Sequence, residues 1–102
     1  MTDNIAPVFD PPHPGEFITA TYLRPLGVSA RSLAASLGVA PTSVTRILSG
    51  AARVTPEMAV RLEAVLGRSA ESWLKMQGTH DLRAARESVD TKRLARIDAV
   101  AV

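Results

Sequence analysis

The segment SARSLAASLGVAPTSVTRILSG, residues 29–50, decides how this chain of 102 residues is built. Its first half has apolar residues at helical spacing, and Gly38 follows them where a helix end favours a residue that tolerates the left-handed conformation. Pro41 suits the first position of a second helix, because its missing N–H would be unpaired there anyway. Gly50 closes that second helix. The predicted apolar stripes are Leu33, Ala34 and Leu37 in one helix and Val44, Ile47 and Leu48 in the other.

The outward face of the second predicted helix is polar. Short hydroxyl side chains and one forked cation, Arg46, can reach base edges and phosphates. Two helices joined in this way form a helix-turn-helix, which sets its second helix in the major groove of DNA. A plain helical hairpin with a solvated polar face has the same spacing, so spacing alone leaves both interpretations open. The candidate contacts on this helix are Pro41, Thr42, Ser43, Thr45, Arg46 and Ser49.

The distribution of charge favours nucleic acid over simple solvation. Although the net charge is only +2, no Asp or Glu occurs between Glu16 and Glu57. A surface that faces phosphates has such a local excess of positive charge. The arginines in this span are Arg24, Arg31, Arg46 and Arg53. Further phosphate contacts are expected from Ser29, Arg31 and Ser32, at the start of the first helix of the motif, and from Arg53 in the loop after the second.

Composition limits the class of protein. The length is that of one domain, and a hydrophobic content of 46% is enough for a core. The chain has no cysteine, which excludes disulfides and thiolate metal sites. It also has no apolar run near the ~18 residues of a membrane span, and its N-terminus does not resemble a signal peptide. No stretch alternates as a strand would, so we expect an all-α protein of the cytoplasm, with no membrane partner.

Capping and breaking residues predict five helices. The first runs from Glu16 to about Arg24, where Pro25 ends it. Its expected inward residues are Phe17, Ile18, Ala20 and Leu23. The second begins after Ser29 and the third near Ala40. The fourth begins at Thr55-Pro56-Glu57 with an apolar face of Met58, Ala59, Leu62, Val65 and Leu66, and the fifth begins at Ser69 and continues past Gly78.

These helices define three predicted parts of the chain. Residues 1–14 are proline-rich and form an extended, flexible arm. Residues 15–78 form the helix-turn-helix domain, and residues 79–102 form a helical C-terminal extension. The mixed charge of this extension leaves three alternatives open, namely a solvated helix, a dimer contact and partial disorder.

The whole pattern resembles the Cro/C1-repressor type of helix-turn-helix domain. More narrowly, residues 12–85 resemble the HigA antitoxins of type II toxin–antitoxin modules. Three pieces carry this resemblance: HPGE at 13–16, the run from Gly50 through Ala59 with its TPEMA, and Ser72-Trp73-Leu74. The chain departs from the family at Ala40, where a serine or threonine cap is common. The missing cap costs the third helix about 1 kcal/mol.

The resemblance implies a function and partners. It implies a homodimer that binds a palindromic operator in its own promoter, with Pro41 to Ser49 as the recognition helix. It also implies that the protein neutralises a HigB toxin, similar to RelE-fold ribonucleases, through the N-terminal arm with the first helix or through the side opposite the DNA face. A stand-alone repressor and a helical interaction module that does not bind DNA remain as alternatives.

Nothing in the sequence predicts an enzyme, a cofactor or a metal site. His13 and His80 are far apart in the chain, without partners at metal-ligand spacing or a nucleophile motif. Trp73 is expected to be a core anchor between the fourth and fifth helices, because lone aromatic residues usually serve packing.

Overall fold

The computed structural model describes residues 11–97, and all regular structure within that range is helical. The first helical segment combines α1 (Pro14–Ile18), a π-helical turn η2 (Thr19–Leu23) and α2 (Arg24–Leu26). It is followed by α3 (Ala30–Leu37), α4 (Pro41–Leu48), α5 (Pro56–Leu66), α6 (Ala70–Ser88) and a short 3-10 turn, η3 (Thr91–Arg93). These elements confirm the all-α, five-helix fold that the sequence predicts.

The prediction that Pro25 ends the first helix is wrong. The helical segment continues through Pro25 to Leu26 and ends at Gly27, which has a left-handed φ of 65°. In a regular α-helix the proline ring clashes with the carbonyl four residues earlier. Here the wider η2 turn precedes the proline, and the Arg24 N–H bonds to the Thr19 carbonyl five residues back. This π turn shifts the preceding carbonyls, so the helix accommodates the ring.

The same π turn explains a second error, at Ala20. The sequence placed Ala20 inward, but its side chain is exposed, whereas Ile18 and Leu23 are buried as expected. A π turn advances fewer degrees per residue than an α turn, so an inward position computed from 3.6-residue spacing drifts off the core face. Phe17 is half-buried against the core.

The starts and stops of the remaining helices follow the predicted capping residues. The side chains of Ser29, Thr55 and Ser69 each accept a backbone N–H at the start of α3, α5 and α6. Gly38 ends α3 with φ 72°. Ala40 has the extended backbone of an N-cap, but no side chain caps α4.

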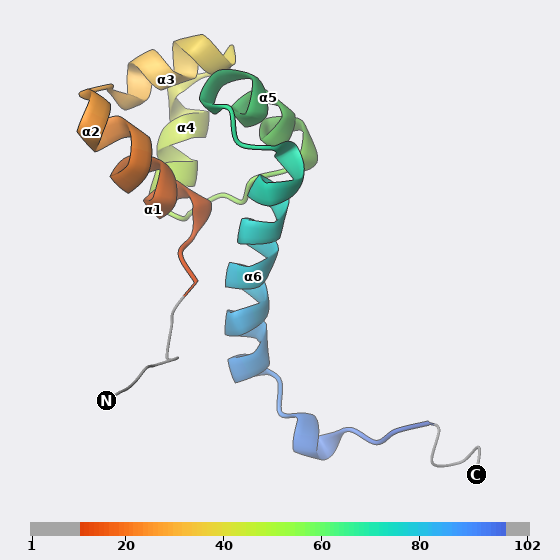
Figure 1. Ribbon diagram of the computed structural model, residues 1–102. Coiled ribbons are helices and arrows are strands. Elements are labelled where there is room, and N and C mark those ends of the chain that lie inside the picture. The colour runs from red at the N-terminus through yellow and green to blue at the C-terminus, as the bar shows by residue number, and fades with distance from the viewer. Residues whose placement is uncertain (1–10, 98–102) are drawn as a thin grey trace, which may run out of the picture.

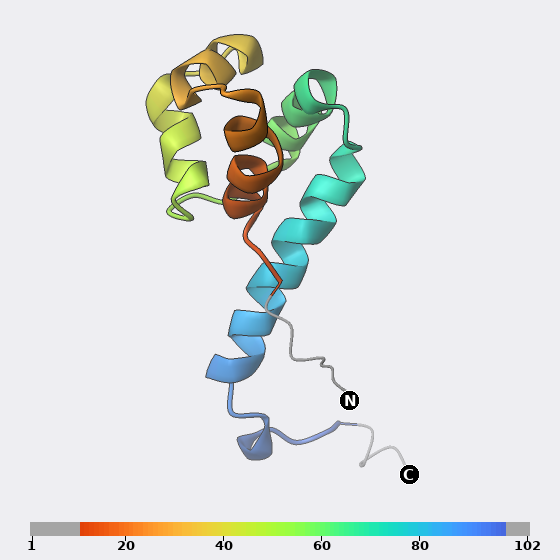
Figure 2. The same ribbon diagram turned by 60° about the vertical axis from the view of Figure 1, so that its left-hand side comes forward.

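The core lies between the first helical segment, α3, α4, α5 and the start of α6 (Figures 1 and 2). Trp73 is fully buried, and its ring lies 5.9 Å from that of Phe17 and 6.3 Å from that of Tyr22. The anchoring role predicted for Trp73 is therefore confirmed, with the addition that it also holds the first helical segment. On α5, Ala59 and Leu62 are buried and Met58 and Leu66 half-buried, but Val65 is exposed.

Helix α6 continues through Gly78 as expected and extends beyond the bundle, as Figures 1 and 2 show. Its second half is mostly exposed. Leu82 in this half and Val89 directly after the helix are each 50% exposed. Within residues 11–97, no helix is long and apolar enough to cross a membrane.

Candidate nucleic-acid interface

Helix α4 packs by one face and presents the other to solvent. Val44 and Ile47 are buried in the same core cluster as Ala34, which is 1% exposed. The small side chain of Ala34 leaves room for α3 and α4 to approach closely. All six residues predicted on the opposite face are exposed: Pro41, Thr42, Ser43, Thr45, Arg46 and Ser49. The amphipathic pattern thus turns the polar side chains outward together.

These polar side chains are not equally available to a ligand. The Thr45 and Ser49 hydroxyls donate to carbonyls of their own helix, those of Thr42 and Arg46, at 3.2 and 3.1 Å. Among residues 11–97, the side chains of Thr42, Ser43 and Arg46 make no hydrogen bond or ion pair. The three side chains best able to donate to DNA are therefore in the first two turns of α4.

The predicted contacts at the start of α3 lie in a cap. Ser29 accepts the Ser32 N–H at 3.1 Å, and its hydroxyl donates to the Ser32 hydroxyl at the same distance. Both serines and Arg31 are exposed. An uncrowded helix N-terminus with hydroxyls and a cation beside it suits a phosphate.

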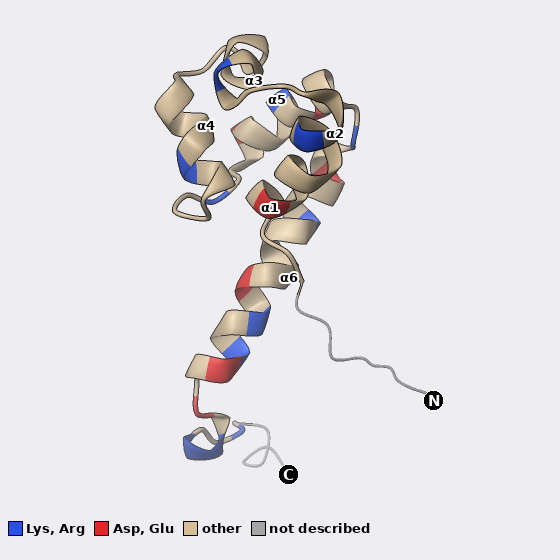
Figure 3. Ribbon diagram, turned by 90° about the vertical axis from the view of Figure 1, so that its left-hand side faces the viewer, with Lys and Arg blue, Asp and Glu red and all other residues tan. Residues whose placement is uncertain are grey.

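A shallow hollow joins α4 to the loop that follows it. Its volume is about 290 Å³, and it is lined by Ser43, Arg46, Ile47, Ala52, Arg53, Thr55 and Met58. Two arginines seven residues apart in sequence therefore border one surface. Figure 3 shows that α3, α4 and the loop after α4 carry basic but no acidic residues.

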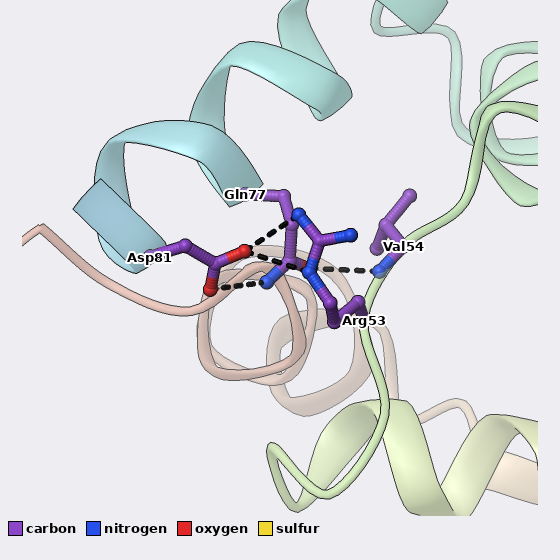
Figure 4. A network of polar contacts seen from close by, with 4 residues as sticks. All are labelled: Arg53, Val54, Gln77 and Asp81. Atoms are coloured by element: carbon purple, nitrogen blue, oxygen red, sulfur yellow. Dashed lines mark hydrogen bonds and ion pairs between the residues drawn. The ribbon is translucent and has the colours of Figure 1, made fainter. Parts of the chain in front are cut away.

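Arg53 differs from Arg46 because it already has a partner. Its Nε and Nη2 donate to one carboxylate oxygen of Asp81 in α6, at 2.7 and 2.6 Å (Figure 4). Burial on its own raises the pKa of Asp81, but hydrogen bonds from Arg53 and Gln77, with the charges of Arg53 and His80, outweigh it and hold that pKa below its ordinary value.

Sequence reasoning missed Gln77 and Asp81. Gln77 is 1% exposed; its Oε1 accepts the Val54 N–H at 2.8 Å, and its Nε2 donates to Asp81 Oδ1 at 3.1 Å. The available signal was a pair of polar residues four apart on a helix, since such residues share a face. Their partners are more than twenty residues away, so the spacing alone does not identify them.

The structure also brings together the two histidines that are distant in sequence. The rings of His13 and His80 meet edge to face with centroids 5.2 Å apart. His13 Nδ1 accepts the Gly15 N–H at 3.0 Å and so caps α1, and His80 Nδ1 lies 3.0 Å from the Pro11 carbonyl oxygen. Burial lowers the pKa of His13, and the neighbouring His80 lowers it further.

The two histidine rings pack against each other, and His13 also caps α1. Residues 11–97 contain no group of three or more His, Cys, Asp or Glu side chains that could hold a metal ion. The capping role occupies the Nδ1 lone pair of His13, which leaves that atom unable to coordinate.

Fold and sequence together identify the class of protein. The helix-turn-helix family profile matches residues 20–73, which run from the first helical segment to the start of α6. The chain belongs to the Cro/C1-type helix-turn-helix family, whose members include antitoxins and transcriptional regulators.

Three relatives illustrate this family. The HTH-type transcriptional regulator YddM of Escherichia coli K12, itself uncharacterized, is 41% identical over 86 residues, which span 84% of this chain and 90% of YddM. The structure of antitoxin GraA has a TM-score of 0.82 at 35% identity, and the match covers 87% of this chain and 99% of GraA. The structure of Pseudomonas aeruginosa antitoxin HigA with the higBA promoter has a TM-score of 0.73 at 29% identity, covering 76% and 85% of the two chains.

Proposed function

We propose that this protein is an antitoxin that also represses its own promoter. The observation that supports DNA binding is the exposed face of α4, which carries Arg46 and the hydroxyls of Thr42 and Ser43. These side chains lie in a stretch of the chain that contains arginines but no acidic residue (Figure 3). A relative with the same fold, Pseudomonas aeruginosa HigA, has been solved with promoter DNA. In keeping with the family, the function proposed is binding rather than catalysis.

In this proposal α4 is the recognition helix. Arg46 reads a guanine through its O6 and N7, and Thr42 and Ser43 contact a base edge or a phosphate near the helix N-terminus. The serines that cap α3, together with Arg31, position the DNA backbone. Pro41, Thr45 and Ser49 line the same surface, and Arg53 is a second phosphate contact beside it.

A homodimer on a palindromic operator fits this geometry. Two recognition helices related by a two-fold axis would meet half-sites about one helical turn, ~34 Å, apart. Helix α6 and the segment after it are our first choice for the dimer contact, since the apolar side chains from Leu82 onward are largely exposed.

The proposed function also includes the neutralisation of a toxin. Similarity to antitoxins GraA and HigA supports a neutralising role, and we propose a HigB-type ribonuclease as the target. The chain folds over most of its length, so we assign toxin binding to the folded surface with the N-terminal arm. Residues 1–10 of that arm lie outside the described residues.

Footprinting on the DNA directly upstream of the gene, with and without the product of the neighbouring gene, tests both halves. Protection of a palindromic sequence by this protein alone supports its role as a repressor. A change in that protection when the product of the neighbouring gene is added, or relief of that product's toxicity by this protein, supports its role as an antitoxin. Binding to DNA without any neutralised partner would leave the alternative of a stand-alone repressor. Absence of salt-dependent binding would leave a helical interaction module.

A further inference from the structure

One face of α6 holds two consecutive residues of the loop that follows the recognition helix (Figure 4). Gln77 accepts the backbone N–H of Val54, and Asp81 accepts two N–H groups from the side chain of Arg53. Gln77 and Asp81 are four residues apart and therefore share a side of the helix. The loop is thus attached to α6 both through its backbone and through its exposed cation.

The Asp81 carboxylate determines how the Gln77 amide is oriented. An ionised carboxylate only accepts hydrogen bonds, so the amide nitrogen of Gln77 must face Asp81 Oδ1, at 3.1 Å. The amide oxygen is then turned to the Val54 N–H, at 2.8 Å. Gln77 and Val54 are each 1% exposed, and a buried N–H without a partner is costly. Asp81 therefore acts on the loop by two routes.

The contact with Asp81 uses one edge of the Arg53 guanidinium and leaves its remaining N–H groups exposed to solvent. Nε and Nη2 donate to Asp81 Oδ2, and the Arg53 side chain is still 66% exposed. An arginine has five N–H donors in a rigid fork, so it can bind a carboxylate on one edge and a phosphate at its end. A side chain ordered in advance also loses less conformational entropy when it binds.

We infer that Asp81 is a positioning residue for DNA binding, which aims the outer end of Arg53 at a backbone phosphate beside the hollow bordered by Arg46 and Ser43. This inference rests on the proposed function and adds to it a residue of α6 outside the helix-turn-helix. It also gives a role to an acidic side chain that holds an arginine beside a hollow whose own lining contains no acidic residue.

The inference is tested by a double-mutant cycle on full-length protein. Binding to a fluorescent duplex of the upstream DNA is measured over a series of salt concentrations for the wild type, Arg53→Ala, Asp81→Asn and the double variant. Arg53→Ala should reduce the slope of log K against log salt by about 0.9, the share of one phosphate contact. Asp81→Asn should weaken binding about tenfold, the size of one lost charge-assisted hydrogen bond, and reduce the slope in the same direction.

The double variant decides whether Asp81 acts through Arg53. If it does, Asp81→Asn has no further effect once Arg53 is alanine, because the asparagine oxygen can still accept the Gln77 amide N–H and so keeps the contact with Val54 in place. Additive losses would mean that Asp81 merely supports the fold, and tighter binding by Asp81→Asn would mean that it competes with phosphate; either result overturns the inference. Unchanged binding by Asp81→Asn overturns it as well, while leaving the proposed function intact. A wild-type protein that does not bind the duplex overturns both.

Two further variants control for charge and folding. Glu71→Gln removes one negative charge from an exposed site in the first turn of α6, outside this network, and should leave the affinity within about twofold of the wild type. Arg53→Lys leaves α6 unaltered and keeps the charge, but a lysine has no second edge for Asp81 to hold. It should lose affinity with little change of slope, and wild-type affinity in this variant would contradict the inference.

Discussion

The backbone of Gly15 lies directly against the carbonyl of Ile47, so closely that a Cβ on Gly15 would come within 1.9 Å of the Ile47 oxygen. Gly15 is the second residue of α1, and Ile47 is in the last turn of α4. The glycine is therefore needed for close approach, and the histidine before it supplies the cap of the same helix. The HPGE segment at 13–16 thus packs against the C-terminal end of α4 and fixes its position.

Gly15→Ala should destabilise the protein by about 1–3 kcal/mol, the usual cost of overpacking a close contact. The obstructing atoms belong to backbone, so no side-chain rotation relieves them. Urea unfolding followed by circular dichroism gives the free energy. Gly78→Ala is the matched control, because a Cβ at Gly78 within α6 meets nothing within 4 Å. This control should stabilise the helix by about 0.5–1 kcal/mol, and equal effects of the two substitutions would refute the close-approach argument.

Local rules predicted the helix ends because each depends on a few neighbouring residues. Ser29, Gly38, Thr55 and Ser69 act through bonds to groups within a turn of themselves. The same rules failed at Pro25, since the π turn that accommodates the proline changes the backbone upstream of it. A rule based on the proline and its immediate neighbour does not include that adjustment.

In the candidate interface too, local rules identify some features and miss others. The outward face of α4 follows from helical periodicity, so Thr42, Ser43 and Arg46 were found from the sequence. The environment of Arg53 depends on Gln77 and Asp81 of α6, which lie more than twenty residues further along the chain. Tertiary packing sets such contacts, and periodicity within one segment carries no information about them.

Ala40→Ser should stabilise the protein by about 1 kcal/mol, because it supplies the side-chain cap that α4 lacks. The backbone of Ala40 already has the extended conformation of an N-cap, with φ −67° and ψ 145°. The midpoint of urea unfolding should rise accordingly. Ala64→Ser, at an exposed position within α5, serves as the control and should be slightly destabilising. A serine at 40 that changes nothing would show that the start of α4 is already satisfied by solvent.

Arg46→Ala should cost about 1–3 kcal/mol of operator binding and should relax the preference for one base pair. Arg53→Ala should weaken binding to all sequences alike, because a phosphate contact carries no sequence information directly. Competition between the operator and single-base variants of it distinguishes the two. Unchanged discrimination in Arg46→Ala would remove this residue from the proposed base contacts.

The stability of the folded protein should fall as the pH is lowered below about 6.5, because of His13. Burial, followed by the nearby His80, lowers the pKa of His13 below its ordinary value of 6.5. The His13 side chain of the unfolded chain therefore binds a proton at a higher pH than that of the folded protein does. The stabilisation is complete above the pKa of the unfolded state and is lost as the pH falls through the lower pKa of the folded state. Protonation also places a hydrogen on Nδ1, which then cannot accept the Gly15 N–H.

Urea unfolding at several pH values measures this dependence, and His13→Asn provides the comparison. Asparagine keeps an N-cap acceptor but does not titrate, so its unfolding midpoint should be nearly constant across this window. Asp81 contributes in a separate, more acidic window: its pKa is held below the ordinary 3.8, so its stabilisation is present above that value and is lost as the pH falls further. Asp81→Asn should therefore flatten only the acidic part of the profile. A His13→Asn variant that keeps the full wild-type slope just below pH 6.5 would exclude His13 as the titrating group.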